Sequence, residues 1–387
     1  MFQRWIDIDE TRSCLIIGPR RCGKTTLLKN RYPHLNYVTL DDLDYLQWAQ
    51  NDPKGLVAEL GREAIIDEVQ RCPSLMIAVK YAIDNLGARF FMTGSSSIGL
   101  LDAVSDTLAG RINIYSLPTA CWGEHTDSRP DHDIFLDKMA FPKIKAAQRR
   151  LQDAMTFGLF PEVATQNTPE EKRAVLTNYK NTYFIRDLMQ LANIENLDGL
   201  LSIFHNLARS LGSHLEISNF AREAGISHVT AKKYLNSLLQ SQLTFKLLGY
   251  QYGPAKRFIK AAKTYFADNG IIASLNISVS EGQLLENFVI SELEKRRKLG
   301  FIPSDRFFYY KSVSGREIDL VFEADGIVYA LEIKATKSPR VRDIRNLVVF
   351  GESLKRPVRL FLFYLGEEYK TIKNVHIIPV SSIFLGR

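Results

Sequence analysis

The sequence is poor in cysteine, and this scarcity excludes two classes of protein. Only four cysteines occur in 387 residues (Cys14, Cys22, Cys72 and Cys121), and no two of them form a C-x-x-C pair. Four scattered cysteines without such a pair argue against a zinc site and against a disulfide framework, so we expect neither. Scattered thiols of this kind indicate a reducing cytoplasm.

Long apolar runs are missing as well. No stretch approaches the ~18 consecutive apolar residues that a membrane-spanning helix needs, and residues 1–7 contain no apolar signal segment. We therefore expect a cytoplasmic protein without a membrane partner. The composition, 45% hydrophobic and 24% charged, is that of a globular protein. At this length two or three domains are expected.

The net charge of +7 is distributed unevenly along the chain. Residues 1–200 are slightly acidic, whereas residues 201–387 hold 27 Lys and Arg against 17 Asp and Glu. A basic half favours a polyanionic partner, and nucleic acid is the most common one. A basic surface without a partner is the alternative, because charge alone does not identify a ligand.

A glycine-rich loop connects a short apolar stretch to an expected helix. Residues 18–26 fit G-x-x-x-x-G-K-[ST], the spacing of a phosphate-binding P-loop. The loop N–H groups and the positive helix end attract phosphate. Lys24 is expected to reach the β- and γ-phosphates of ATP, and Thr25 to bind Mg²⁺. The predicted nucleotide-binding residues are Gly18, Pro19, Arg20, Arg21, Cys22, Gly23, Lys24, Thr25 and Thr26.

Two carboxylates end the apolar stretch of residues 64–66, in the pattern known as Walker B. Two acids at the end of a buried strand are costly without a cation, which favours a functional interpretation over a simple polar turn. We expect Asp67 to hold Mg²⁺ and Glu68 to orient and deprotonate the attacking water. The next strand, residues 89–95, carries Thr93 and Ser95, which are expected to contact the γ-phosphate or that water.

The alternation of strands and helices through residue 115 predicts a parallel sheet with helices on both faces. A helix is expected from Ile98 to about Ala109, and mostly helical segments from about residue 143 to 200. In residues 201–264, a short helix, a turn at Gly225 and a second helix capped by Ser227 predict a helix-turn-helix followed by a wing.

The start of that second helix is where a helix-turn-helix contacts DNA. The candidate DNA-contacting residues are His228, Thr230, Lys232 and Lys233. Many winged helices bind only protein, and this alternative stays open.

The last third of the chain contains a predicted β-hairpin with clustered charges. Residues two apart on a strand face the same side, so Glu332 and Lys334 point together, and the Asp325-Gly326 turn brings Asp319 alongside. Glu286 lies on an expected preceding helix, residues 283–297. Carboxylates so arranged would bind Mg²⁺ or Mn²⁺, with Lys334 activating a water, as in PD-(D/E)xK nucleases.

Taken together, these motifs resemble a bacterial and archaeal ATPase family that joins an AAA+ core to a winged helix and a PD-(D/E)xK-like region. The resemblance implies an AAA+ P-loop core (1–142), a helical lid or linker (143–200), a winged helix (201–264) and a nuclease-like domain (265–387). Departures from the family pattern are Leu117-Pro118-Thr119, where Pro-Leu-Ser is usual, and the lack of a Gln-x-x-x-Tyr helix after Lys334. The matching stretches are Gly18–Thr26, Ile65–Gln70, Thr93–Ser97, Leu108–Arg111, Phe157–Val163, the helix-turn-helix, Tyr265–Gly270, and Glu286 with Asp319, Glu332 and Lys334.

The same resemblance implies a role for Arg111. We call residues 89–95, with Thr93 and Ser95, the sensor strand. Arg111 lies between the helix after this strand and the next strand. In AAA+ ATPases an arginine at this point commonly reaches the nucleotide of a neighbouring subunit, which implies a ring-shaped homo-oligomer. A surface arginine is the alternative.

Two functions follow from the motifs. The first is a DNA-stimulated Mg-ATPase that acts on DNA as a motor, junction remodeller or nuclease-coupled enzyme. The second is a regulatory NTPase switch whose C-terminal half binds a protein and carries an inactive nuclease fold.

Overall fold

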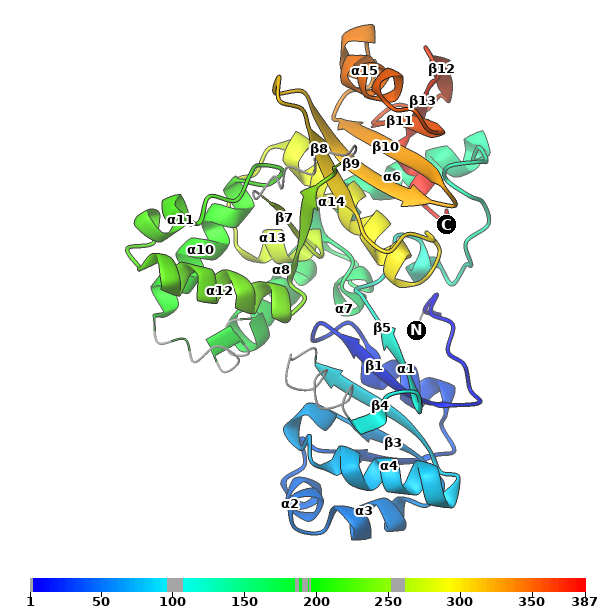
Figure 1. The fold of residues 1–387 in the computed structure, drawn as a ribbon, viewed down its shortest axis with the longest axis vertical. Coiled ribbons are helices and arrows are strands. Elements are labelled where there is room, and N and C mark those ends of the chain that lie inside the picture. The colour runs from blue at the N-terminus through cyan, green and yellow to red at the C-terminus, as the bar shows by residue number, and fades with distance from the viewer. Residues whose placement is uncertain (1–2, 96–106, 185–187, 190–193, 195, 252–261) are drawn as a thin grey trace. The chain divides into compact units, whose positions relative to one another are not determined.

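The computed structural model describes residues 3–95, 107–184, 188–189, 194, 196–251 and 262–387. The chain forms two compact units, one of Ile6–Thr119 with Gln240–Gln242 and the other of Met1–Trp5, Ala120–Leu239 and Leu243–Arg387 (Figure 1). Most of the helix expected from Ile98 to Ala109 lies outside the described residues, as do Ser96 and Ser97. Among the described residues, no helix is long and apolar enough to cross a membrane.

The first unit is built on a five-stranded sheet in the order β2-β3-β4-β1-β5, and every pairing in it is parallel. This confirms the predicted parallel α/β organisation. Its elements are β1 (Ser13–Gly18), α1 (Lys24–Arg31), β2 (Asn36–Thr39), α2 (Leu43–Asn51), α3 (Pro53–Leu60), β3 (Glu63–Asp67), η1 (Val69–Arg71), α4 (Leu75–Leu86), β4 (Arg89–Ser95) and β5 (Ile112–Ser116).

Side chains of alternating positions cover the two faces of this sheet. Leu15, Ile66 and Met92 belong to a buried cluster with residues of α2, α3 and α4. On the opposite face, Phe91 stacks on Tyr32, which follows α1, with ring centroids 4.1 Å apart. Because successive strand residues face opposite sides, both faces are apolar and both are covered by helices.

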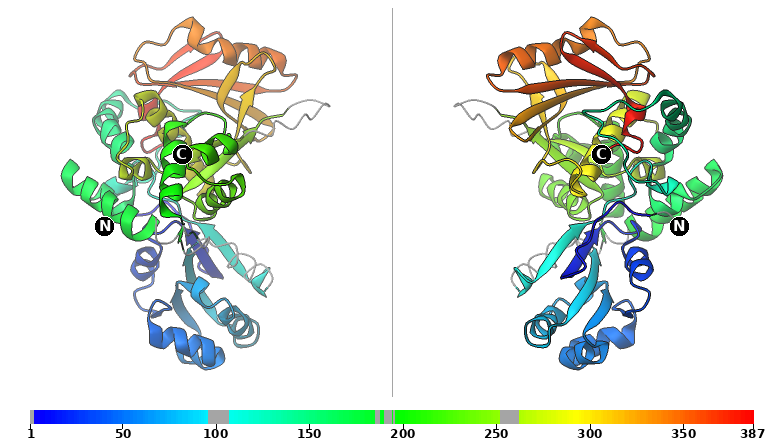
Figure 2. Two further views of the ribbon diagram at one scale, coloured as in Figure 1. Left: turned by 90° about the vertical axis from the view of Figure 1, so that its left-hand side faces the viewer. Right: turned by 90° about the vertical axis from the view of Figure 1, so that its right-hand side faces the viewer.

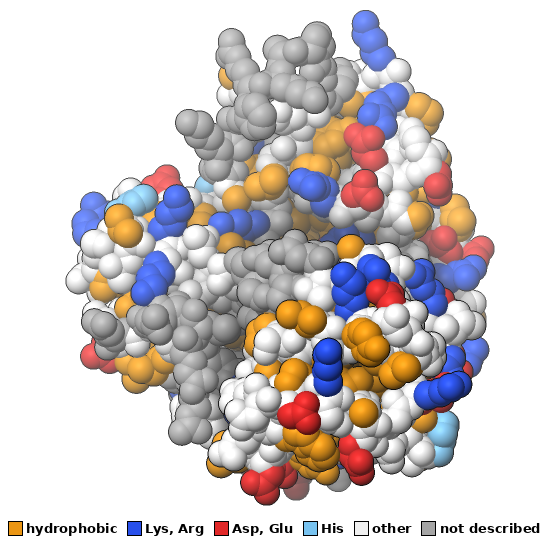
Figure 3. Space-filling model, turned by 60° about the horizontal axis from the view of Figure 1, so that its bottom comes forward, with side chains coloured by type: hydrophobic (Ala, Val, Ile, Leu, Met, Phe, Trp, Pro, Cys, Tyr) orange, Lys and Arg blue, Asp and Glu red, His pale blue; other side chains and the backbone are white. Residues whose placement is uncertain are grey.

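Some apolar side chains of this unit remain at the surface. The exposed large ones on α2 and α4 include Leu43, Trp48, Ile77 and Tyr81. Figure 3 shows hydrophobic side chains there among acidic and basic ones. They give the unit apolar surface that an association with another molecule could bury.

The second unit contains a mixed eight-stranded sheet in the order β12-β13-β11-β10-β9-β8-β6-β7 (Figure 2). Its helices and strands are α6 (Phe141–Phe157), α7 (Pro161–Ala164), α8 (Pro169–Tyr179), η3 (Lys180–Phe184), α10 (Leu197–Arg209), α11 (Ile217–Glu223), α12 (His228–Gln240), β6 (Thr244–Gly249), β7 (Lys263–Phe266), α13 (Asn269–Ser274), α14 (Glu281–Lys298), β8 (Phe308–Lys311), β9 (Glu317–Ala324), β10 (Ile327–Lys334), α15 (Arg345–Ser353), β11 (Val358–Tyr364), β12 (Lys370–Ile372) and β13 (Val375–Pro379).

Helices α14 and α15 cover opposite faces of this second sheet. Phe288 of α14 shares a buried cluster with Leu331 and Phe361, whereas Leu347 of α15 shares another with Ala330 and Leu360. Neighbouring positions on β10 and β11 thus face different helices. The expected hairpin of β9 and β10 is present, with Asp325 and Gly326 at positive φ in its turn.

The structure does not separate residues 201–264 from residues 265–387. Strand β6 pairs antiparallel with β7 and parallel with β8, so the expected wing continues into the C-terminal sheet. Helices α10 to α12 also share one buried cluster with Phe266 and with residues of α8 and α13. Strand pairing therefore crosses the boundary expected at residue 264 and joins both segments in one compact unit.

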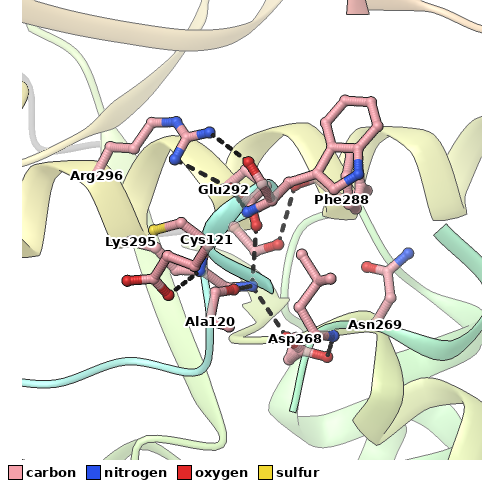
Figure 4. A network of polar contacts seen from close by, with 12 residues as sticks. Ala120, Cys121, Asp268, Asn269, Phe288, Glu292, Lys295 and Arg296 are labelled. Carbon is pink, nitrogen blue, oxygen red and sulfur yellow. Dashed lines mark hydrogen bonds and ion pairs between the residues drawn. The ribbon is translucent and has the colours of Figure 1, made fainter. Parts of the chain in front are cut away.

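The boundary expected at residue 142 also differs from the structure, in which residues from Ala120 onward belong to the second unit. The reason is a buried charge cluster on α14, drawn in Figure 4. Lys295 Nζ donates to Ala120 O at 3.1 Å, to Asp268 Oδ2 at 3.0 Å and to Glu292 Oε1 at 3.1 Å. The Trp122 N–H donates to Glu292 Oε2 at 3.1 Å. These bonds attach the segment that follows the first unit to α14.

Candidate functional site: a P-loop and a Walker B strand in the first unit

The P-loop adopts a conformation that depends on its two motif glycines. Gly23 has a φ of 94°, in the left-handed region that favours glycine. Gly18 ends β1, and a Cβ at this position would lie 2.1 Å from the backbone oxygen of Leu117, which follows β5. Only glycine fits at this contact. Helix α1 begins at Lys24, directly after the loop, so its free N–H groups face the loop as an anion site requires.

Lys24 is buried and lies within its own loop. Its Nζ donates to the backbone oxygens of Gly18 and Pro19, at 3.0 and 3.1 Å. These two carbonyls hold the ammonium group of Lys24 in the loop. Among the contacts described, Lys24 has no carboxylate partner. The charge is therefore placed beside the N–H groups, where a phosphate would meet both.

Asp67 is the centre of a hydrogen-bond network at the end of β3. Its Oδ1 accepts from the hydroxyl of Thr25 at 2.8 Å and from the hydroxyl of Thr93, and its Oδ2 accepts from the Tyr37 hydroxyl at 2.9 Å. Burial, and then the charge of Asp67, raise the pKa of Tyr37. The network therefore connects the P-loop helix, the Walker B strand and the sensor strand.

Glu68 follows with an unusual backbone. Its φ is 59°, a left-handed conformation that is uncommon for residues other than glycine. The Glu68 N–H donates to Thr93 Oγ1 at 3.2 Å, and its carboxylate accepts from the side-chain amide of Gln70. The two Walker B carboxylates thus have different side-chain partners, three hydroxyl groups for Asp67 and the Gln70 amide for Glu68.

The structure brings together some of the residues that the sequence predicted for the nucleotide site. Thr25, Asp67, Glu68 and Thr93 lie in one hydrogen-bonded network, whereas Ser95 joins it through its backbone N–H, which donates to Gln70 Oε1 at 3.2 Å. Tyr37 and Gln70 were not predicted as site residues. Gln70 ends the family-matching stretch Ile65–Gln70, but the sequence indicated no role for its side chain, and nothing in the position of Tyr37 indicates that its hydroxyl meets Asp67.

Arg111 makes a contact that the sequence did not suggest. Its Nε lies 2.7 Å from Asp84 Oδ1 of α4, and both side chains are about one-third exposed. The hydrogen bond to Asp84 raises the pKa of Arg111, and the same bond lowers the pKa of Asp84. The guanidinium is thus held at the surface at the start of β5.

A second cluster of charged residues lies on the hairpin of the second unit. Lys334 Nζ is 2.9 Å from Glu332 Oε2, and the Ile333 N–H donates to Asp319 Oδ2 at 2.8 Å. Glu286 on α14 accepts from the Tyr265 hydroxyl at 2.7 Å. Burial and the charge of Asp319 raise the pKa of Glu286 to about 7 and that of Glu332 well above its usual value.

The four predicted residues of this cluster lie close together, since Asp319 acts electrostatically on both Glu286 and Glu332, and Lys334 pairs with Glu332. Metal binding by them stays a prediction. Among the residues that the structure describes, no three Asp, Glu, His or Cys side chains are grouped so that they could hold a metal ion. Lys334 supplies the compensating positive charge to Glu332, and burial shifts both acids toward their neutral forms.

Glu286 is expected to make the stability of the protein depend on pH. Its pKa rises from 4.5 to about 7, so between these values the folded state binds the extra proton and stability falls as pH rises. We expect Glu286→Gln, which cannot ionise, to gain thermal stability relative to the parent between pH 5 and pH 8. The measurement is Tm at both values for the two proteins, and a constant difference would contradict the expected titration.

Helices α11 and α12 flank a turn at Gly225 in the segment for which the sequence predicted a helix-turn-helix. The Ser227 hydroxyl accepts from the Thr230 N–H at 3.0 Å, as a helix cap does. His228, Lys232 and Lys233 are exposed at the start of α12. Burial, and then the positive charge of Lys232, lower the pKa of the half-buried Lys246 on β6, so these two lysines lie near each other.

Three family models match consecutive parts of the chain. Residues 10–126 match an AAA domain, residues 148–281 match DUF8612, and residues 281–383 match DUF4143; the last two are domains of unknown function.

Whole-chain similarities involve proteins without a known role. An uncharacterized protein of Mycobacterium tuberculosis is 26% identical over 385 residues, which covers 95% of this chain and 80% of that protein. One of Methanocaldococcus jannaschii is 26% identical over 354 residues, covering 86% and 77%.

Solved structures give weaker similarities. A signal-transduction ATPase with a tetratricopeptide repeat sensor from Pyrococcus horikoshii has a TM-score of 0.25 and 10% identity, covering 77% of this chain and 46% of that one. A Vibrio cholerae protein has a TM-score of 0.22 and 11% identity, covering 96% and 95%. Neither TM-score supports an inference about this chain. The P-loop, the all-parallel sheet and the family match agree that residues 10–126 of this chain are similar to an AAA domain.

Proposed function

We propose that the protein hydrolyses Mg-ATP in its first unit and acts on DNA through its second. The observation that carries the ATPase part is the network in which Asp67 joins Thr25 of the P-loop helix to Thr93 of the sensor strand. This network brings the P-loop, the Walker B strand and the sensor strand to one edge of the sheet. A nucleotide binds at that edge in α/β folds.

The oxygen ligands at this edge suit Mg²⁺. The Thr25 hydroxyl and the Asp67 carboxylate lie 2.8 Å apart, and Mg²⁺ prefers such hard oxygen donors. These two residues would hold the ion, which neutralises phosphate charge when bound. Lys24 and the loop N–H groups bind the phosphates, and Glu68 takes the proton of the attacking water.

The DNA part of the proposal is supported by charge. Positive residues exceed acidic ones by ten in residues 201–387, and α12 with β6 places Lys232 near Lys246. The protein-binding switch is the second candidate, and it is supported by the ion pair that engages Glu332 of the hairpin cluster with Lys334 at 2.9 Å. The test that separates the two is the rate of ATP hydrolysis with and without single-stranded, duplex and branched DNA. Stimulation by DNA supports the first function, and an unchanged rate supports the second.

Lys232 and Lys233 are expected to contribute to DNA affinity through phosphate contacts. Changing both to Glu should weaken binding and reduce the slope of log affinity against log salt by about two, because about one counterion is released for each phosphate contact. Affinity is measured by fluorescence anisotropy on the full chain at several salt concentrations. A fragment starting at residue 201 is unsuitable because it would divide the buried clusters of the second unit.

The matched control for this pair is Lys355→Glu with Lys373→Glu, two exposed lysines elsewhere in the second unit. It introduces the same change in net charge. An equal loss of affinity in both variants would contradict a DNA surface on α12 and β6.

Arg111 is expected to complete the site of a neighbouring subunit. Arg111→Ala should then lose most ATP turnover, and mixing it with Lys24→Ala should restore part of it, since each variant supplies what the other lacks. Activity is measured against the mixing ratio, and the mass of the assembly is measured with ATP and DNA.

Asp84→Ala is the control for this prediction because it removes the only partner described for the Arg111 guanidinium outside its own strand and loop. If Arg111 served only the contact with Asp84, both alanine variants would lose the same activity. No recovery on mixing, together with a monomeric protein, would rule out the trans role.

A further inference from the structure

Gln70 connects the Walker B acid Glu68 to the end of the sensor strand β4. It lies on η1, the short helix that directly follows β3. Its side chain contacts both the Glu68 carboxylate and the backbone of Ser95 at the end of β4. We propose that Gln70 is a positioning residue that holds the Glu68 carboxylate for the attack of water on ATP. This inference rests on the proposed ATP hydrolysis.

The two ends of the Gln70 amide make different contacts. Its Oε1 accepts from the Ser95 N–H at 3.2 Å, and its Nε2 donates to Glu68 Oε2. A backbone N–H needs an acceptor and a carboxylate needs a donor, so only this orientation of the amide satisfies both. The amide therefore joins β3 to β4 beyond the last paired residues of these two strands, Ile66 and Met92.

The backbone around Glu68 turns Gln70 back toward the site. Glu68 has a φ of 59°, and the N–H of Arg71 donates to Glu68 O at 3.0 Å, which closes the turn. Arg71 is held in turn by Asp41, with Nε 2.6 Å from Oδ1. A left-handed residue other than glycine needs such surrounding contacts to persist, and this kind of strain is common at functional sites.

The arrangement also couples Glu68 to Asp67. Thr93 of β4 donates its hydroxyl hydrogen to Asp67 and accepts from the Glu68 N–H at 3.2 Å, while Ser95 two residues later holds Gln70. Any displacement of the end of β4 is therefore transmitted to both acids. A carboxylate that must orient a water loses rate steeply when it is misplaced by about 1 Å, by on the order of a hundredfold.

The direct test is Gln70→Ala in the full chain. We expect kcat for ATP hydrolysis to fall roughly ten- to a hundredfold, with ATP affinity unchanged, because Gln70 contacts the base and not the P-loop. Gln70→Glu keeps the length of the side chain but cannot donate to Glu68, so it should lose as much. Gln50→Ala, an exposed glutamine on α2, is the matched control and should keep the parental kcat.

A double-mutant cycle separates positioning from general damage to the fold. In a Glu68→Gln background, Gln70→Ala should reduce kcat no further, because the base that it positions is already gone. Three results would overturn the inference. The first is a parental kcat in Gln70→Ala, and the second is a loss of ATP affinity in this variant as large as its loss of kcat. The third is a further loss of kcat in the double variant as large as the one that Gln70→Ala causes by itself. A parent protein that binds ATP and hydrolyses none would overturn the proposed function itself, and this inference with it.

Discussion

Glu68→Gln is expected to bind ATP as the parent does and to lose turnover by roughly a hundredfold or more, because only the acceptor for the water proton is removed. The substituted amide keeps the size of the side chain, so the left-handed backbone of Glu68 and its contact with Thr93 are retained. The measurements are the steady-state rate of phosphate release and the ATP dissociation constant.

Lys24→Ala is the complementary variant. It removes the ammonium group that Gly18 O and Pro19 O hold in the loop, so ATP binding should be lost together with turnover. Hydrolysis by Glu68→Gln at the parental rate would assign the base to another residue. Unchanged ATP affinity in Lys24→Ala would contradict the placement of the phosphates in this loop.

Lys295→Ala is expected to destabilise the second unit by about 3–5 kcal/mol, since it removes the positive charge that compensates two buried carboxylates. Lys295 is 3% exposed, and Asp268 and Glu292 are 1% and 0% exposed. Burial by itself lowers the pKa of Lys295, but these two carboxylates raise it overall. The cluster therefore depends on the lysine being charged.

The measurement for Lys295→Ala is urea-induced unfolding followed by tryptophan fluorescence. Trp122 is buried in the same unit, and its backbone N–H donates to Glu292 Oε2. Lys355→Ala changes an exposed lysine of this unit and should shift the midpoint very little. A midpoint for Lys295→Ala equal to that of the control would contradict a structural role for the buried cluster.

Local sequence was sufficient for the features that depend on short-range chemistry. The spacing of Gly18, Gly23 and Lys24 predicted the P-loop, in which glycine meets the close contact at Gly18 and the positive φ at Gly23, and Lys24 donates to the loop carbonyl of Gly18. Alternating apolar stretches predicted the parallel sheet, and Asp325-Gly326 predicted the hairpin turn. Each of these signals lies within a few residues of the structure that it specifies.

Tertiary structure alone decided where the units divide and which side chains share a site. The pairing of β6 with β8 unites the predicted wing with the C-terminal sheet, and Lys295 on α14 binds Ala120, 175 residues away along the chain. Gln70 meets Ser95 across two strands for the same reason. The hydrogen-bonding groups of a strand edge and a buried charge each need a partner, and any segment that the fold brings near can provide it. The local sequence therefore does not specify which distant residue becomes that partner.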